Sequence, residues 1–294
     1  MSFLSVTDYT RKEVLEVLDL ADKVRENPEK YSKTLAGKTL ISLFEKPSTR
    51  TRISFELAIK QLGGYSVILH SSELQLGRGE TVADTARVFE RYADCVMGRV
   101  LRHQSLIELS QNSSIPIING LSDIEHPCQT MADLQTIQNV RGLEGVKIAY
   151  VGDANNVCAS LMFASQMLGL DLTVGCPKEF SPSKEILEKA KDVKVVEDPI
   201  NAVEDADVVY TDVWVSMGDE KEKDERLRIL KPYQVNAKLM SYARKDAVFM
   251  HCLPAHRGQE VADEVMDSFQ SIVFDQAENR LHAQKAILLR EMGK

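Results

Sequence analysis

The segment Ser48-Thr49-Arg50-Thr51-Arg52 places two guanidinium groups and three hydroxyls within five residues. It follows a predicted strand and opens a predicted helix. The first N–H groups of a helix have no partners within it and the helix dipole is positive there, so a helix start binds anions readily. Two arginines in a first turn cost about 0.3–1 kcal/mol each unless an anion is bound. Because a guanidinium group can also donate two hydrogen bonds at once to phosphate oxygens, the segment predicts a site for a small phosphate-bearing anion.

Two simpler interpretations explain less. Ser48 alone is a suitable helix N-cap, but that leaves the two arginines unexplained. A nucleotide site is not indicated, because the chain contains neither GxxxxGK[ST] nor GxGxxG. The glycine-containing turn at 152–156 also follows a predicted strand, and Asn155 within it is interpreted as an N-cap.

A histidine and a cysteine are further candidates. His126 stands in His-Pro-Cys-Gln, although a lone histidine is more often structural than catalytic. Cys252 follows a predicted strand, at the strand end where α/β proteins place ligands. The other four cysteines are interpreted as small buried packing residues: Cys95, Cys128, Cys158 and Cys176.

The composition indicates an ordinary globular protein and excludes several classes. The chain has 294 residues, a net charge of −8, and 44% hydrophobic and 27% charged residues. An acidic chain is a poor nucleic-acid binder. Five cysteines without a CxxC pair fit a reducing cytoplasm, and we expect no signal peptide and no membrane span.

The elements that carry these residues alternate between strand and helix. In the first half we predict strands at 39–44, 67–69, 95–97 and 115–118, and helices from the Thr10–Glu13 capping box onward and at 53–62 and 81–92. This alternation predicts a mostly parallel sheet covered on both faces.

The pattern restarts after a long predicted helix at 131–140. Strands are predicted at 146–151, 172–174, 193–196, 208–210 and 248–250, and helices at 157–168, 183–191 and 279–292. We therefore expect an α/β protein of two domains joined by long helices. The charge run at 219–228 is interpreted as a solvated, mobile face. Because it adjoins the Ser-Met-Gly segment, a closing lid is a second hypothesis.

Four segments in this order resemble the aspartate/ornithine carbamoyltransferase family. Residues 44–52 resemble its carbamoyl-phosphate loop, and 126–129 resemble its His-Pro-x-Gln segment. Residues 212–218 (Asp-Val-Trp-Val-Ser-Met-Gly) and 251–258 (His-Cys-Leu-Pro-Ala-His-Arg-Gly) resemble the ornithine branch. The resemblance covers essentially the whole chain. It implies transfer of a carbamoyl group from carbamoyl phosphate to the δ-amino group of L-ornithine, giving citrulline and phosphate, without metal or cofactor.

The resemblance also implies a role for each matching residue. Residues 1–135, with the last helix 279–294 packing back on them, would bind carbamoyl phosphate, and 136–278 would bind ornithine. The implied carbamoyl-phosphate ligands are Ser48, Thr49, Arg50, Thr51, Gln75, Arg99, His126, Gln129, Cys252, Leu253 and Arg280. The implied ornithine ligands are Asn156, Asp212, Ser216 and Met217. The implied catalytic residues are Arg99, His126, Cys252 and Asp212.

Further implications concern assembly and chemistry. Gln75 matches a loop that in this family reaches a neighbouring subunit's site, which implies a homotrimer or a multiple of trimers. Thr51, Arg99 and His126 would donate to the oxyanion of the tetrahedral intermediate. The proton acceptor for the amine, Asp212 or Cys252, stays open.

Two alternatives to ornithine transfer remain. A carbamoyltransferase for putrescine or N-acetylornithine would alter the Ser-Met-Gly region or the phosphate loop, and this chain keeps both in the ornithine form. A non-catalytic amino-acid-binding relative would be expected to lose Arg50, His126 or Cys252, and all three are present.

Overall fold

The protein forms two compact α/β units. The structure, a computed structural model, describes residues 2–74, 79–215 and 222–293. Contacts divide the chain into Met1–Gln135 with Glu278–Lys294 as unit 1, and Thr136–Ala277 as unit 2. The chain leaves unit 1 within helix α6 (Pro127–Arg141) and returns within α13 (Val273–Met292).

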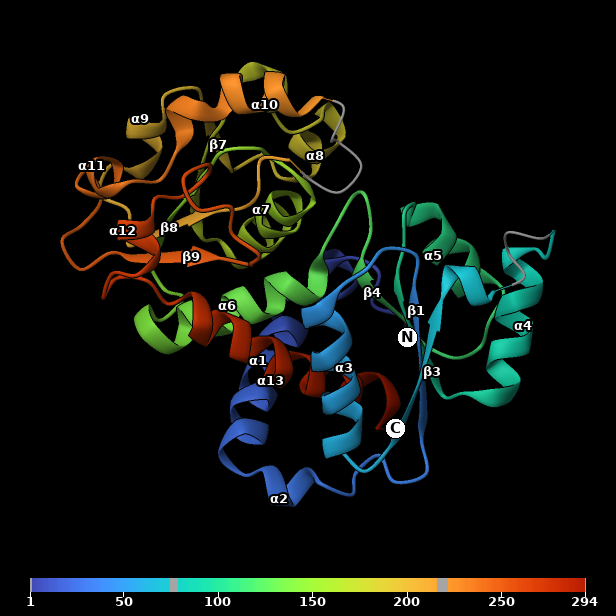
Figure 1. The fold of residues 1–294 in the computed structure, drawn as a ribbon. Coiled ribbons are helices and arrows are strands. Elements are labelled where there is room, and N and C mark those ends of the chain that lie inside the picture. Colours follow the sequence, from blue (N-terminus) through green and yellow to red (C-terminus); the bar gives the residue numbers. More distant parts are fainter. Residues whose placement is uncertain (1, 75–78, 216–221, 294) are drawn as a thin grey trace. The chain divides into compact units, whose positions relative to one another are not determined.

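Unit 1 is built on a four-stranded parallel sheet of order β2-β1-β3-β4 (Figure 1). Its strands are β1 (Thr39–Phe44), β2 (Tyr65–His70), β3 (Cys95–Arg99) and β4 (Ile117–Leu121). Its other helices are η1 (Val6–Asp8), α1 (Arg11–Glu26), α2 (Pro28–Tyr31), α3 (Thr49–Gln61), η2 (Ser71–Glu73), α4 (Val82–Tyr92) and α5 (His103–Gln111).

Alternating side chains of the strands give each face of this sheet its own cover. Ile41 and Leu43 of β1 pack with Phe89 of α4 and Leu106 of α5 in one buried cluster. Figure 1 shows α4 and α5 on that side of the strands and α1 and α3 on the other. Both faces of the parallel sheet are therefore buried, as such sheets require.

Unit 2 is built on a five-stranded parallel sheet of order β7-β6-β5-β8-β9. Its strands are β5 (Lys147–Val151), β6 (Asp171–Gly175), β7 (Lys194–Val196), β8 (Val208–Thr211) and β9 (Val248–His251). Its helices are α7 (Asn156–Leu168), η4 (Lys178–Phe180), α8 (Lys184–Lys189), α9 (Pro199–Val203), α10 (Lys223–Leu230), η6 (Lys231–Tyr233), α11 (Ala237–Met240) and α12 (Asp263–Met266).

Two separate apolar clusters bury the two faces of this sheet. Ile148 and Tyr150 of β5 pack with α7, whereas Ala149 and Val151 pack with α9, α10, α11 and α12. The prediction of two domains with mostly parallel sheets flanked by helices is confirmed.

Several expected boundaries shift, each for a local reason. α3 and α6 begin four residues before the predicted starts, at Thr49 and Pro127, because their first turns are polar and lack apolar periodicity. β4 begins after Pro116, which has no N–H for the ladder. α13 begins at Val273 instead of 279, and α5, which lacks a side-chain cap, was not predicted.

The interpretation of the charge run at 219–228 as a solvated face is wrong at Arg226. This side chain is buried and forms an ion pair with Asp153. Residues 219–221 lie outside the described ranges. Within the parts of the chain that are described, no helix is both long and apolar enough to cross a membrane.

Candidate active site

In unit 1, the candidate residues gather where the strand order reverses. β2 lies on one side of β1 and β3 on the other, so the loops after β1 and β3 diverge at their carboxyl ends. Open α/β sheets bind ligands in that position. Ser48 lies in the loop after β1, and Arg99 is the last residue of β3.

Ser48 is the N-cap of α3, as its simpler interpretation suggests. Its Oγ accepts a hydrogen bond from the Thr51 N–H at 3.3 Å. Arg50 and Arg52 both lie in the first turn, which contains no acidic residue. Arg50 is half-buried, whereas Thr49 and Arg52 are exposed. The helix start thus concentrates positive charge where the dipole is also positive.

Arg280 returns from α13 to this helix start. Its guanidinium donates to Thr51 Oγ1 at 3.1 Å and to Gln129 Oε1 at 2.6 Å. Gln129 in turn donates through Nε2 to Asp133 Oδ1 at 2.8 Å. All four side chains are at least 96% buried. Three helices, α3, α6 and α13, therefore hold one buried cation in a fixed orientation.

His126 is buried near the guanidinium groups of Arg280 and Arg99, a setting that disfavours its protonated form. It precedes Pro127, the first residue of α6, and its carbonyl accepts from the Gln129 N–H at 3.0 Å. Burial, followed by the positive charges of Arg280 and Arg99, holds the pKa of His126 well below its ordinary value. A cluster that keeps a histidine uncharged favours an anion in the same place.

Two further features of unit 1 position Arg99 and were not predicted. The ladder between β3 and β4 shifts register after Gly98, so Gly120 forms a bulge beside Arg99. Glu45 accepts from the Leu101 N–H at 2.6 Å and donates its own N–H to the Arg99 carbonyl at 2.9 Å. Glu45 thus joins the loop after β1 to the loop after β3. In the sequence, the only indication of this role is the polar loop at 45–48.

In unit 2, the candidates also gather where the strand order reverses, between β5 and β8. Asp212 follows β8, and its Oδ2 accepts from Asn155 Nδ2 at 2.8 Å. The side-chain oxygen Oδ1 of Asn155 is occupied as the N-cap of α7, accepting from the N–H groups of Val157 and Cys158. The cap interpretation of Asn155 is confirmed, but its amide also reaches Asp212, which the sequence reading missed. Asn156, the predicted ligand, is the first residue of α7.

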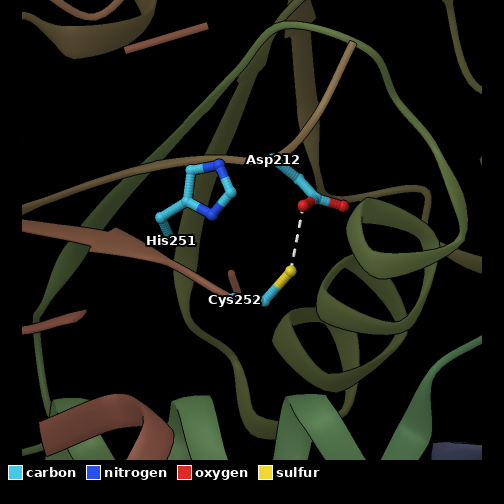
Figure 2. A group of neighbouring side chains, drawn as sticks. All are labelled: Asp212, His251 and Cys252. Carbon is cyan, nitrogen blue, oxygen red and sulfur yellow. Dashed lines mark hydrogen bonds between the residues drawn. The ribbon is translucent and has the colours of Figure 1, made fainter. Parts of the chain in front are cut away.

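The segment after β9 brings a thiol to the same carboxylate. Figure 2 shows Cys252 pointing toward Asp212, and its Sγ donates to Asp212 Oδ1 at 2.9 Å. Leu253 has a φ of 58°, which is unusual for leucine, and its N–H donates to His251 Nδ1 at 2.9 Å. The other ring nitrogen of His251 lies 3.2 Å from the buried carboxylate of Glu260.

Asp212, His251 and Cys252 also satisfy the spacing of a metal site, since their ligand atoms lie within 4.8 Å of one another (Figure 2). The hydrogen bonds argue for a different role. Because Nδ1 of His251 accepts from Leu253, Nε2 carries the hydrogen and donates to Glu260. With both ring nitrogens occupied, His251 acts as a brace for the turn at 251–254.

The structure therefore brings the described candidate residues into two clusters, one in each unit. Unit 1 contains Ser48, Thr49, Arg50, Thr51, Arg99, His126, Gln129 and Arg280, and unit 2 contains Asn156, Asp212, Cys252 and Leu253. The predicted residues Gln75, Ser216 and Met217 lie outside the described ranges. Cys128 is a packing residue as interpreted: it is buried, burial raises its pKa to about 12, and its Sγ donates to the Asn119 carbonyl.

Comparison with known proteins gives matches along nearly the whole chain. Residues 1–139 match the carbamoyl-P binding domain of aspartate/ornithine carbamoyltransferases, and 144–290 match the Asp/Orn binding domain. Ornithine carbamoyltransferase from Thermococcus kodakarensis is 51% identical, over 99% of this chain and 96% of that protein.

Two matches from Pyrococcus furiosus agree with this. Its anabolic ornithine carbamoyltransferase is 50% identical, over 99% of this chain and 96% of that protein. A solved structure of ornithine carbamoyltransferase from the same organism superposes with a TM-score of 0.95 at 48% identity, covering 99% of this chain and 97% of that one.

Proposed function

Because the chain belongs to the aspartate/ornithine carbamoyltransferase family, we propose that it transfers the carbamoyl group of carbamoyl phosphate to the δ-amino group of L-ornithine. The products are L-citrulline and phosphate. The observation that carries this function is the buried Arg280 guanidinium, held by Thr51 and Gln129 beside a neutral His126. That arrangement suits an acyl phosphate, in which the phosphate oxygen is bonded directly to a carbonyl carbon.

The phosphate end of carbamoyl phosphate binds at the start of α3. Ser48, Thr49 and Thr51 contribute hydroxyls and helix N–H groups, and the guanidinium of Arg50 neutralises charge. Arg52 extends the same positive field. The contacts strengthen as the bond between the carbonyl carbon and the phosphate oxygen breaks, because charge then accumulates on the leaving phosphate.

The carbonyl end faces donors of a different kind. Attack by the amine converts the carbonyl oxygen into an oxyanion, and Thr51, Arg99 and His126 donate to it. A fixed donor of this kind contributes about 2.7–4 kcal/mol to lowering the barrier. Burial and the two neighbouring guanidinium groups lower the pKa of His126, which favours a neutral imidazole as the hydrogen-bond donor. Gln129 and Arg280 orient the carbamoyl group, and Gln75 of a neighbouring subunit completes the site.

Ornithine binds at the carboxyl ends of β5 and β8 in unit 2, through Asn156, Asp212, Ser216 and Met217. The Asp212 carboxylate attracts the δ-ammonium group of ornithine. The thiol of Cys252 donates to that carboxylate, and Leu253 shapes the carbamoyl end of the site. Proton loss from the δ-ammonium frees the attacking lone pair, and we assign its acceptor to the Asp212–Cys252 pair.

The active form is a homotrimer or a multiple of trimers. Unit 1 presents large apolar side chains along α3 and the edge strand β2, namely Ile53, Leu57, Tyr65 and Val67. Large exposed apolar side chains at a sheet edge are typical of a subunit contact. Light scattering should give about three times the chain mass, or a multiple, and Tyr65→Glu should reduce it. A monomeric wild-type protein would contradict this assembly.

The protein works in the biosynthetic direction, in the cytoplasm. A relative at 50% identity carries the description anabolic. None of the five cysteines, all of which lie in the described residues, forms a disulfide, and this suits a reducing compartment.

An amine panel tests the proposed function. Purified protein with carbamoyl phosphate should form a ureido product with L-ornithine, and far less with putrescine, N-acetylornithine, L-lysine or L-aspartate. Turnover with putrescine alone would contradict the substrate assignment. Calorimetric binding of ornithine without turnover of any amine would contradict the enzymatic function.

A further inference from the structure

Arg226 of α10 is a buried cation in a helix whose first three residues are charged and exposed. Its Nε donates to the Trp214 carbonyl at 2.7 Å, and its terminal nitrogen forms an ion pair with Asp153. The guanidinium carbon lies 4.3 Å from the centroid of the Phe180 ring. Both Asp153 and Arg226 are 92% buried, so the pair is shielded from the solvent that weakens surface ion pairs.

The partners of Arg226 belong to the two loops that form the candidate ornithine site. Asp153 lies two residues before Asn155 in the turn after β5, and Trp214 lies two residues after Asp212 in the loop after β8. The two loops are joined a second time by the Asn155–Asp212 hydrogen bond at 2.8 Å. Arg226 therefore bridges the same two loops through a second set of contacts.

Phe180 strengthens this bridge. Its carbonyl accepts from the Ala154 N–H at 3.1 Å, while its ring stacks under the guanidinium of Arg226. The turn between Asp153 and Asn155 is consequently held on both sides. A change at Arg226 releases one end of each loop without removing any side chain that contacts substrate.

We infer that Arg226 is a positioning residue for ornithine: it fixes the distance between the turn carrying Asn155 and the loop carrying Asp212. This inference rests on the proposed function, because it takes Asp212 as an ornithine ligand. Displacement of a binding group by about 1 Å can change rates or affinities by about a hundredfold. Carbamoyl phosphate, which binds in unit 1, should be unaffected by loss of the bridge.

The chain offers a matched control in the same unit. Arg244 donates to Asp207 Oδ1 at 2.7 Å, and Asp207 immediately precedes β8. This arginine–aspartate pair also joins β8 to its surroundings, but at the opposite end of the strand from Asp212. A variant at Arg244 removes an arginine–aspartate bond whose arginine is 46% exposed, and leaves the site loops intact.

The test compares Arg226→Gln, Arg226→Lys and Asp153→Asn with Arg244→Gln. The readouts are KM for each substrate, the calorimetric Kd for ornithine and the thermal midpoint. Arg226→Gln and Asp153→Asn should each raise KM and Kd for ornithine about tenfold or more, with KM for carbamoyl phosphate changed less than about twofold. Arg226→Lys should restore part of the affinity, and Arg244→Gln should change only the thermal midpoint.

Unchanged ornithine affinity in Arg226→Gln, or an equal loss for both substrates, would overturn the inference. If the glutamine variant does not fold, Arg226→Lys decides, because weaker ornithine binding at an unchanged thermal midpoint separates positioning from stability. Failure of the proposed function looks different: wild-type protein would make no citrulline. The Kd for ornithine would still decide the role of Arg226.

Discussion

Replacement of Arg280 by glutamine should weaken carbamoyl-phosphate binding far more than it weakens the fold. The guanidinium makes two side-chain hydrogen bonds, at 2.6 Å to Gln129 and 3.1 Å to Thr51. A hydrogen bond to a charged group contributes about 1.5–3 kcal/mol. If one such bond to the phosphate or carbonyl oxygen is lost, the affinity falls roughly 10- to 150-fold.

The effect on stability combines two opposing contributions. Glutamine is too short to reach both partners, and each buried polar group left without a partner costs about 1–3 kcal/mol. Removal of the buried charge relieves its repulsion of Arg99, since both guanidinium groups lie close enough to His126 to lower its pKa. We therefore expect a modest change in the free energy of unfolding, of about 1–2 kcal/mol.

The assay is calorimetry with inorganic phosphate, together with KM for carbamoyl phosphate and for ornithine. Arg290→Gln is the control: Arg290 lies on the same helix, but pairs with Glu13 and Glu16. It should leave KM for carbamoyl phosphate unchanged. Wild-type phosphate affinity in Arg280→Gln, in a protein that melts normally, would refute the role given to this residue.

Three further outcomes follow from the two clusters. Cys252→Ser should keep more activity than Cys252→Ala, because the hydroxyl can still donate to Asp212; equal kcat values in the two variants would contradict a donor role. Because the pKa of His126 is lowered on folding, the unfolded chain binds its proton first, so stability should fall as pH drops below about 6.5, and less so in His126→Gln. If the melting temperatures of wild type and His126→Gln fall in parallel from pH 8 to 5, His126 is not the cause of the loss of stability. Gly120→Ala should destabilise the protein by about 1–3 kcal/mol and raise KM for carbamoyl phosphate, since a new Cβ would lie 2.4 Å from Met97 Sδ; an unchanged melting temperature would refute it.

The strand cores and several helix starts could be predicted from sequence. β1 was predicted residue for residue, because its apolar run is closed by Pro47 and the polar turn. The Thr10–Glu13 capping box does begin α1, and Gly169 ends α7 in a left-handed conformation. These signals are local, so a single sequence carries them.

Features that depend on long-range contacts could not be predicted. Arg226 sits in a run of charged residues, and only its tertiary partners, Asp153 and the Trp214 carbonyl, make it a buried residue. Asn155 was interpreted from its cap alone, because its contact with Asp212 spans 57 residues. The register shift at Gly120 depends on a neighbouring strand and leaves no periodic signal.

The contacts of Arg280 and Gln129 illustrate what the sequence can predict and what it cannot. Its participation was inferred from resemblance, and the structure places its guanidinium against Thr51 and Gln129. The onward contact from Gln129 to Asp133 was not foreseen, although a spacing of four residues on a helix is a local signal that could have suggested it.

The most direct test of the account follows the carbamoyl carbon itself. Carbamoyl phosphate labelled with ¹³C at that carbon is incubated with the protein and L-ornithine, and the product is observed by NMR. The expected result is label in the ureido carbon of citrulline, with one phosphate released for each citrulline formed. Release of phosphate with the label in cyanate or bicarbonate, and none in citrulline, would contradict carbamoyl transfer to ornithine.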